Sequence, residues 1–206
     1  MYFVKSPLWL QYIYPSLIWH KDRKEKHVYL TFDDGPIPDI TPFVLHTLRQ
    51  FDAKATFFCV GNNLTQYPDI HQQEKHTNHA IGNHTYNHLN GWQTADDHYL
   101  ADIKQCGQLI STNLFRPPHG KIKRSQIAKL KKMNPLLQVI MWDVLSYDFD
   151  QKISPQQCLD HVLKNTQNGS IIVFHDSLKA FGRLEYTLPQ TLKHLTSEGY
   201  SFDALE

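Results

Sequence analysis

Two adjacent carboxylates, Asp33 and Asp34, end an apolar run in the segment VYLTFDDGP at 28–36. Adjacent carboxylates repel each other, and the interior of a sheet or barrel holds little water to screen them. A divalent cation is the usual means of neutralising such a pair. The pattern therefore indicates a metal site at the end of a buried strand, and metal-assisted hydrolysis is the chemistry that such a site supports.

Two histidines at i,i+4 spacing, His84 and His88, follow the second carboxylate by fifty residues. In a chain with thirteen histidines such a pair is weak support by itself, and two surface imidazoles on a turn are the alternative. The preceding Ile81 and Gly82 place the pair at the end of a predicted strand. Two imidazoles and one carboxylate leave a cation with open positions for water and substrate, which is the catalytic and not the structural pattern.

The segment FRPPHG at 115–120 ends another predicted strand. Its two prolines stiffen the backbone, and Gly120 permits an unusual turn. Such a rigid loop can aim a backbone N–H at a developing oxyanion, and an ordinary structural loop is the alternative.

His175 ends the strongly apolar segment 170–175. A lone histidine in that position is more often a satisfied core residue. Asp148 comes from the preceding strand, however, and could both orient the imidazole and keep it charged.

Short apolar runs alternate with segments of helical period from residue 28 onward. Several runs are apolar at successive positions, as in parallel strands that are buried on both faces. Strands are predicted at 28–33, 54–60, 79–83, 114–117, 137–144, 170–175 and 200–203. Helices are predicted after a cap at Thr41, near 68–76, after Thr94, after Ser125, after Ser154 and through 188–195.

This alternation predicts right-handed βαβ units and a parallel sheet. The polar residues described above follow the carboxyl ends of five different strands, which is the layout of a barrel active site. An open doubly wound sheet is the alternative, but its glycine-rich dinucleotide turn is absent. A full eight-unit barrel needs about 250 residues, so a chain of 206 predicts an α/β fold with an incomplete or distorted (β/α) barrel of about seven parallel strands.

Length and charge bound the organisation and the partners. We expect residues 1–26 to form an aromatic N-terminal arm that packs on a single catalytic domain at 27–206. The chain has 21 basic and 20 acidic side chains and no dense Lys/Arg stripe, which argues against nucleic acid as a partner. Three widely separated cysteines predict small buried residues and no disulfide framework.

The arm is no clear signal peptide, because it lacks a basic leader and a small-residue cleavage site. Its prolines and polar residues interrupt it too often for a transmembrane segment. We expect a cytoplasmic location by default, with peripheral membrane or envelope association as the alternative. The sequence leaves the oligomeric state open.

Five segments together resemble the motifs of the polysaccharide deacetylase family, the NodB-homology fold of carbohydrate esterase family 4. They are TFDDGP at 31–36, HTYNH at 84–88, RPPHG at 116–120, and the stretches 142–149 and 173–175. The resemblance extends over about residues 27–205. The five segments occur in the family's order, and each lies at a predicted strand end.

The resemblance implies a ligand set and a cofactor. Asp34, His84 and His88 would hold one divalent metal ion. Zinc is the first choice in this family, and Co²⁺, Ni²⁺ or Mn²⁺ are alternatives.

The resemblance also implies catalytic roles. Asp33 would be the general base, steadied by Arg116. His175 would be the general acid that protonates the leaving amine, oriented by Asp148. The backbone N–H of His119, together with the metal, would hold the oxyanion.

Four positions depart from the family pattern, one of them Asn78, which stands before His79 where glycine is usual. His119 stands where tyrosine is usual, Phe149 replaces a tryptophan beside the acidic residue of the fourth motif, and Leu145 replaces an aspartate in that motif.

The predicted function is removal of N-acetyl groups from amino sugars of a glycan or cell-wall precursor. Hydrolysis of another small amide or of an O-acetyl ester is an alternative with the same chemistry. A non-catalytic carbohydrate-binding protein on the same scaffold is an alternative of another class. A binder would not need a base and an acid together, which favours the enzyme.

Overall fold

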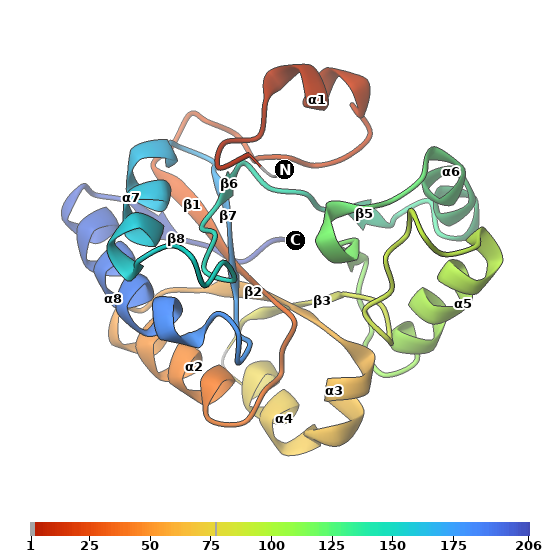
Figure 1. Ribbon diagram of the computed structural model, residues 1–206, viewed down its shortest axis with the longest axis horizontal. Coiled ribbons are helices and arrows are strands. Elements are labelled where there is room, and N and C mark those ends of the chain that lie inside the picture. The colour runs from red at the N-terminus through yellow and green to blue at the C-terminus, as the bar shows by residue number, and fades with distance from the viewer. Residues whose placement is uncertain (1–2, 77) are drawn as a thin grey trace.

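The computed structural model describes residues 3–76 and 78–206 of the chain. Within these residues seven parallel strands follow one another in the order β5-β4-β3-β2-β1-β7-β6, and β8 pairs with β1 beside this path. Their bounds are β1 His27–Asp33, β2 Ala55–Cys59, β3 Ala80–Asn83, β4 Leu114–Phe115, β5 Gln138–Val139, β6 Val144–Leu145, β7 Ile171–His175 and β8 Ser201–Phe202. The curled, incompletely closed sheet confirms the predicted incomplete barrel (Figure 1).

The helices lie around the outside of this sheet (Figure 1). Their bounds are α1 Leu8–Ile13, α2 Ile40–Gln50, α3 Gly61–Gln66, α4 Pro68–His76, α5 Asp96–Gly107, α6 Arg124–Met133, α7 Pro155–Asn165 and α8 Phe181–Ser197, with a 3₁₀ turn, η1, at Pro118–Gly120. None of the helices in the described ranges is long and apolar enough to cross a membrane.

Strand β1 lies at the centre of the sheet, between β2 and β7. The ring of Phe32 is fully buried and stacks on Phe57 at 5.1 Å and on Phe174 at 5.9 Å between centroids. Burial of three such rings stabilises the middle of the barrel by several kcal/mol, on the order of 2 kcal/mol each. The next residue of β1, Asp33, is therefore held in a fixed position opposite His175 of β7.

One predicted strand, 137–144, is wrong as a single element. Its two halves are β5 and β6, which lie at opposite ends of the strand order. The amide of Ile140 donates to the carbonyl of Phe115 in β4, whereas the amide of Asp143 donates to the carbonyl of Ile171 in β7. The extended chain thus crosses from one edge of the curled sheet to the other, and an apolar pattern cannot show such a change of partner.

The N-terminal arm covers the gap between these two edges (Figure 1). The amide of Leu145 in β6 donates to Val4 at 2.8 Å, and the amide of Ile18 donates to Val139 in β5 at 2.9 Å. Backbone groups of an edge strand need such partners if they are not to face solvent or a second molecule. Residues 1 and 2 of the predicted arm lie outside the described residues, and the division into arm and catalytic domain stays a prediction.

Thr41, predicted as the cap of a helix, lies inside α2, whose N-cap is Asp39. The Thr41 hydroxyl instead donates to the Asp176 carboxylate at 2.5 Å and accepts from the amide of Ile37 at 2.8 Å. Asp176 is fully buried, and a buried carboxylate needs donors.

Asp143 anchors the arm to the barrel. Its carboxylate is fully buried and accepts from Lys5 at 2.8 Å, from Arg23 at 3.2 Å and from Ser170 at 2.6 Å. Burial acts to raise the pKa of this carboxyl, but the bonds from Lys5 and Ser170 and the charge of Arg23 lower it below its usual range.

We expect Asp143→Asn to reduce the free energy of unfolding at pH 7 by about 1–3 kcal/mol, because an amide loses both ion pairs in a buried place. A group with a lowered folded-state pKa contributes stability above its unfolded pKa and loses it as the pH falls through the folded pKa. The difference between the two proteins should therefore shrink below about pH 4. Urea unfolding over a pH series measures this, and Asp160→Asn, at an exposed ion pair on α7, should leave the midpoint unchanged.

Candidate active site

The two adjacent carboxylates at the end of β1 both approach His84, with Asp33 Oδ2 at 4.0 Å and Asp34 Oδ1 at 3.8 Å from its Nε2. Asp34 adopts a left-handed conformation with φ 84°. A side chain at Gly35 would lie 2.0 Å from the Asp176 carboxylate, so only glycine fits the turn. Asn63 of α3 donates to the carbonyl of Asp34 at 2.7 Å, a contact that the sequence did not predict.

Asp34, His84 and His88 form a cluster of three metal-ligand side chains. Their ligand atoms all lie within 4.8 Å of one another. The Nε2 atoms of His84 and His88 lie 3.8 and 3.1 Å from Asp34 Oδ1. Ligands bound to a tetrahedral zinc at about 2.0–2.1 Å are about 3.3 Å apart, so the cluster fits an ion of this kind.

His84 is oriented for coordination through Nε2. Its Nδ1 lies 2.8 Å from the carbonyl oxygen of Arg116, which can only accept, so Nδ1 carries the proton and Nε2 faces the cluster. Burial lowers the pKa of His84 to about 4, although Asp33 opposes the shift. The imidazole is therefore neutral near pH 7, as a metal ligand must be.

A buried carboxylate that the sequence analysis missed holds the histidine loop in place. Asp102 of α5 accepts from the amides of Tyr86 and Asn87, both at 2.9 Å, and from the Asn87 side chain at 2.6 Å. Asp102 lies three residues after Tyr99 and four before Cys106, on the buried face of α5. A charged residue at an apolar position was the signal that could have identified it.

Asp33 is paired with a fully buried guanidinium. Arg116 Nη1 donates to Asp33 Oδ1 at 2.7 Å and to the hydroxyl of Thr31, two residues earlier in β1, also at 2.7 Å. The other terminal nitrogen of Arg116 donates to the carbonyl of Met141 at 2.9 Å. These bonds fix one oxygen of Asp33. Its second oxygen lies 4.0 Å from Nε2 of His84, one of the three clustered ligand side chains.

His175 and Asp148 form a second charged pair. The Nδ1–H of His175 donates to Asp148 Oδ1 at 2.7 Å, and the backbone amide of His175 donates to Oδ2 at 2.7 Å. Burial acts to lower the pKa of the imidazole, but the charge and hydrogen bond of fully buried Asp148 outweigh it and raise the pKa of His175 to about 10. The imidazole is therefore a cation near pH 7, and its Nε2–H can donate a proton.

Asp148→Asn should lower the pKa of His175 from about 10, because burial remains while the largest opposing charge and its hydrogen bond are lost. NMR titration of the imidazole in the metal-free protein measures the shift. Asp150→Asn, two residues away on the same loop, is the control and should leave the pKa unchanged. An equally high pKa in Asp148→Asn would show that this carboxylate does not charge the imidazole.

His119 lies at the centre of η1 with φ 59°, a left-handed conformation. The amides of Gly120 and Lys121 donate to the carbonyls of Pro117 and Pro118 and so form the hydrogen bonds of this turn. The amide of His119 makes no backbone hydrogen bond among the described residues. Its N–H thus remains able to donate to a ligand. The ring of His119 packs edge-on against His88 at 4.7 Å between centroids.

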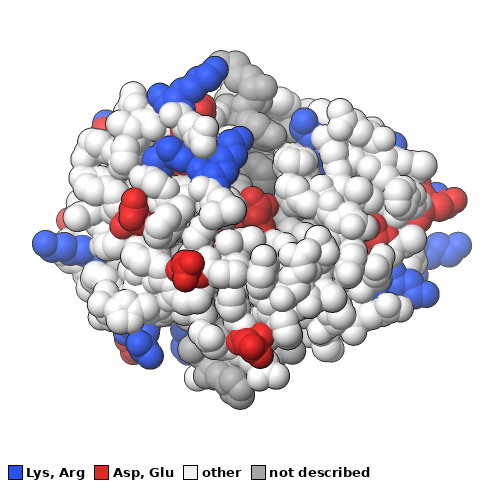
Figure 2. Space-filling view, turned by 60° about the horizontal axis from the view of Figure 1, so that its bottom comes forward, with Lys and Arg blue, Asp and Glu red and all other residues white. Residues whose placement is uncertain are grey.

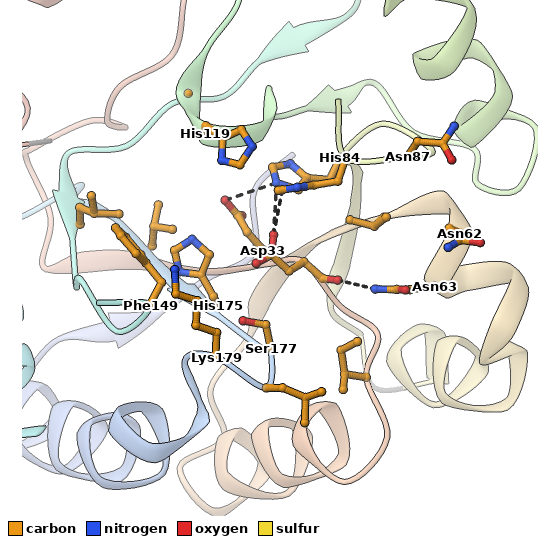
Figure 3. A pocket seen from close by; sticks show the side chains of 18 of the residues that line it. Asp33, Asn62, Asn63, His84, Asn87, His119, Phe149, His175, Ser177 and Lys179 are labelled. Carbon is orange, nitrogen blue, oxygen red and sulfur yellow. Dashed lines mark hydrogen bonds and ion pairs between the residues drawn. The ribbon is translucent and has the colours of Figure 1, made fainter. Parts of the chain in front are cut away.

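These groups meet in one cavity of about 740 Å³. Six of the eight predicted site residues line it: Asp33, Asp34, His84, His88, His119 and His175. Arg116 and Asp148 are fully buried behind it. Figure 3 shows Asp33 and His84 directed toward one another, with His119 on one side and His175 and Phe149 on the other.

The charge around the cavity is mixed. Lys179 lines its mouth and lies 5.8 Å over the ring of Phe149. Figure 2 shows a hollowed face with scattered acidic side chains and no continuous stripe of Lys and Arg among the described residues on that face.

The chain is similar to known proteins over most of its length. A family model described as polysaccharide deacetylase matches residues 20–135. A peptidoglycan-N-acetylglucosamine deacetylase of Bacillus cereus is 33% identical over 193 residues, which are 89% of this chain and 88% of that protein. The chain belongs to the polysaccharide deacetylase family. The family predicted from the five motifs is thereby confirmed.

Two further polysaccharide deacetylases extend the comparison. A chitooligosaccharide deacetylase of Azorhizobium caulinodans is 32% identical over 161 residues, 75% of either chain. The crystal structure of the Bc1960 peptidoglycan N-acetylglucosamine deacetylase, in complex with a naphthalenyl N-hydroxybenzamide, superposes with a TM-score of 0.87 at 28% identity. It covers 97% of this chain, so the similarity includes the arm region as well as the barrel.

Proposed function

We propose that this chain is a metal-dependent deacetylase that removes N-acetyl groups from amino sugars of a glycan. The observation that supports this most is the gathering of a three-ligand cluster, an ion-paired carboxylate and a histidine–aspartate pair around one cavity. The names of the two curated relatives, for peptidoglycan N-acetylglucosamine and for chitooligosaccharides, support N-acetylglucosamine residues as the substrate.

Asp34, His84 and His88 would hold the ion, and their nitrogen and oxygen donors suit zinc. When bound, such an ion polarises the acetamide carbonyl and lowers the pKa of a nearby water to about 7.

Asp33 would accept a proton from the attacking water through its oxygen on the cluster side. Arg116 keeps the other oxygen engaged, so the carboxylate is already oriented when the substrate binds. The backbone N–H of His119 would donate to the carbonyl oxygen as negative charge develops on it.

His175 would donate its Nε2 proton to the nitrogen of the breaking C–N bond. An amine leaves poorly unless it is protonated, and a cationic imidazole supplies that proton at neutral pH. Asp148 holds the ring through Nδ1, so that Nε2 points into the cavity.

Release of acetate tests the proposal. The protein is incubated with N-acetylglucosamine oligomers and with acetylated peptidoglycan, after addition of Zn²⁺ or Co²⁺, and acetate and free amine are measured together. Equal amounts of both products support the deacetylase. Inactivity of the wild type on every acetylated glycan tried would favour the carbohydrate-binding or small-amide alternatives.

A further inference from the structure

We propose that the N-terminal arm and the loop around Trp92 build a second sugar subsite, which holds the residues of the glycan next to the one being deacetylated. The inference rests on the proposed function for the identity of the chain that reaches both sites. Its physical basis is a groove outside the catalytic cavity.

The groove has a volume of about 350 Å³ and adjoins the catalytic cavity. His119, Gly120 and Trp142 line both spaces, so the wall between them is a single layer of side chains. A side chain at Gly120 would lie 2.5 Å from the Trp142 ring, which shows how closely this wall is packed. A chain-like ligand that leaves the cavity over His119 therefore meets the groove next.

The walls of the groove present ring faces and few free polar atoms. Trp92 is 59% exposed, yet its indole N–H already donates to the carbonyl of Ile122 at 3.1 Å. The indole N–H of Trp19 donates to Tyr14 at 3.2 Å, and both of these rings border the groove. The Ser6 hydroxyl donates to the Trp142 carbonyl at 2.6 Å.

This composition suits a pyranose ring. The two faces of a β-linked pyranose carry C–H bonds, whereas its hydroxyl groups project from the rim. A ring that stacks on the exposed face of Trp92 buries apolar surface and leaves its hydroxyls in water, so no buried polar group is left unpaired. The ammonium of Lys121 lies over the Trp92 ring, 5.7 Å from its centroid, and offers a donor to the hydroxyls of a sugar that binds beside it.

Both sides of the groove are fixed before a ligand arrives. The arm is held by the ion pairs of Asp143 and by its bonds to both edges of the sheet. On the other side, the carbonyl of Gly91 accepts from Gln126 at 2.9 Å, and the amide of Trp92 donates to Asn90 Oδ1 at 3.0 Å. A preorganised groove adds affinity because little order has to be created on binding.

The outer side of the arm is a separate surface. Leu8 and Tyr12 of α1 are 69% and 83% exposed and do not line the groove. A lipid surface would contact these side chains first. The groove shares three lining residues with the catalytic cavity, and this proximity favours the neighbouring sugars as its occupant.

The test compares N-acetylglucosamine oligomers from the dimer to the pentamer. In the wild type kcat/KM should rise with length. Trp92→Ala should lower kcat/KM for the pentamer by about tenfold and for the dimer by less than about twofold, the scale of one stacking contact. Trp92→Phe should restore most of the loss, and Tyr12→Ala should behave as wild type. An equal loss at every length, or no loss with the pentamer, would overturn the subsite.

Calorimetric binding of the pentamer to Asp33→Asn, with and without Trp92→Ala, separates this inference from the proposed function. Weaker binding in the double variant supports the subsite even where the wild type releases no acetate. Acetate release without any dependence on Trp92 refutes the subsite alone. Sedimentation with phosphatidylglycerol vesicles tests the alternative occupant, a lipid surface. If Trp92→Ala abolishes vesicle binding and leaves pentamer binding intact, the groove holds lipid and the inference is wrong.

Discussion

Asp33→Asn is expected to lower kcat by at least about a hundredfold, the contribution of a general base. The amide is the same size but cannot take a proton from water. Because Asp33 is not one of the three clustered ligands, the metal content and KM should change little. Steady-state acetate release and elemental analysis of the same sample measure both quantities.

This variant also removes the charge opposite a fully buried Arg116. An unpaired buried guanidinium destabilises the fold, so thermal unfolding must accompany the kinetics. A variant that is folded, loaded with metal and still active within a few-fold of wild type would show that another group accepts the proton. Loss of metal from the folded variant would instead place Asp33 among the ligands.

His84→Ala should lower the affinity for Zn²⁺ by at least about a hundredfold, because loss of a ligand costs more than the 10–100-fold seen for its hydrogen-bonding partners. Activity should fall to background with it. In the wild type a chelator should have the same effect, and Zn²⁺ or Co²⁺ should reverse it.

The midpoint of thermal unfolding reports zinc binding independently of activity. A ligand that binds only the folded state raises the midpoint, so added Zn²⁺ should stabilise the wild type and not His84→Ala. His46→Ala, at an exposed histidine of α2, is the matched control and should keep the zinc response. The response should also weaken as the pH falls, because protons compete for the imidazoles. A normal response in His84→Ala would contradict the predicted ligand set.

Much of the site was predictable because its residues lie at strand ends. The apolar runs before Asp33 and His175 locate β1 and β7, and parallel strands bring their carboxyl ends to one edge. The structure accordingly brings the predicted residues together around one cavity. Their chemical roles stay predictions until they are measured.

The supporting contacts were not predictable in the same way. Asp102, Asp176 and Thr31 act through hydrogen bonds to residues that are distant in sequence, and their residue types alone do not indicate a partner. The division of 137–144 into β5 and β6 depends on which edge each half meets, and hydrophobic pattern carries no information on that. The short helices α1 and α3 were missed because six residues give too little periodicity.

The arm that covers the gap in the barrel has a consequence for how the protein assembles. Lys5 and Asp143 are separated by 138 positions. The contact between them therefore has one of the larger entropic costs of loop closure in the fold. An intermediate that has formed the sheet without the arm presents two unsatisfied strand borders, each able to recruit another molecule. Refolding yield should therefore depend steeply on protein concentration, and removal of the first twenty residues should cause self-association even though every proposed catalytic side chain is retained.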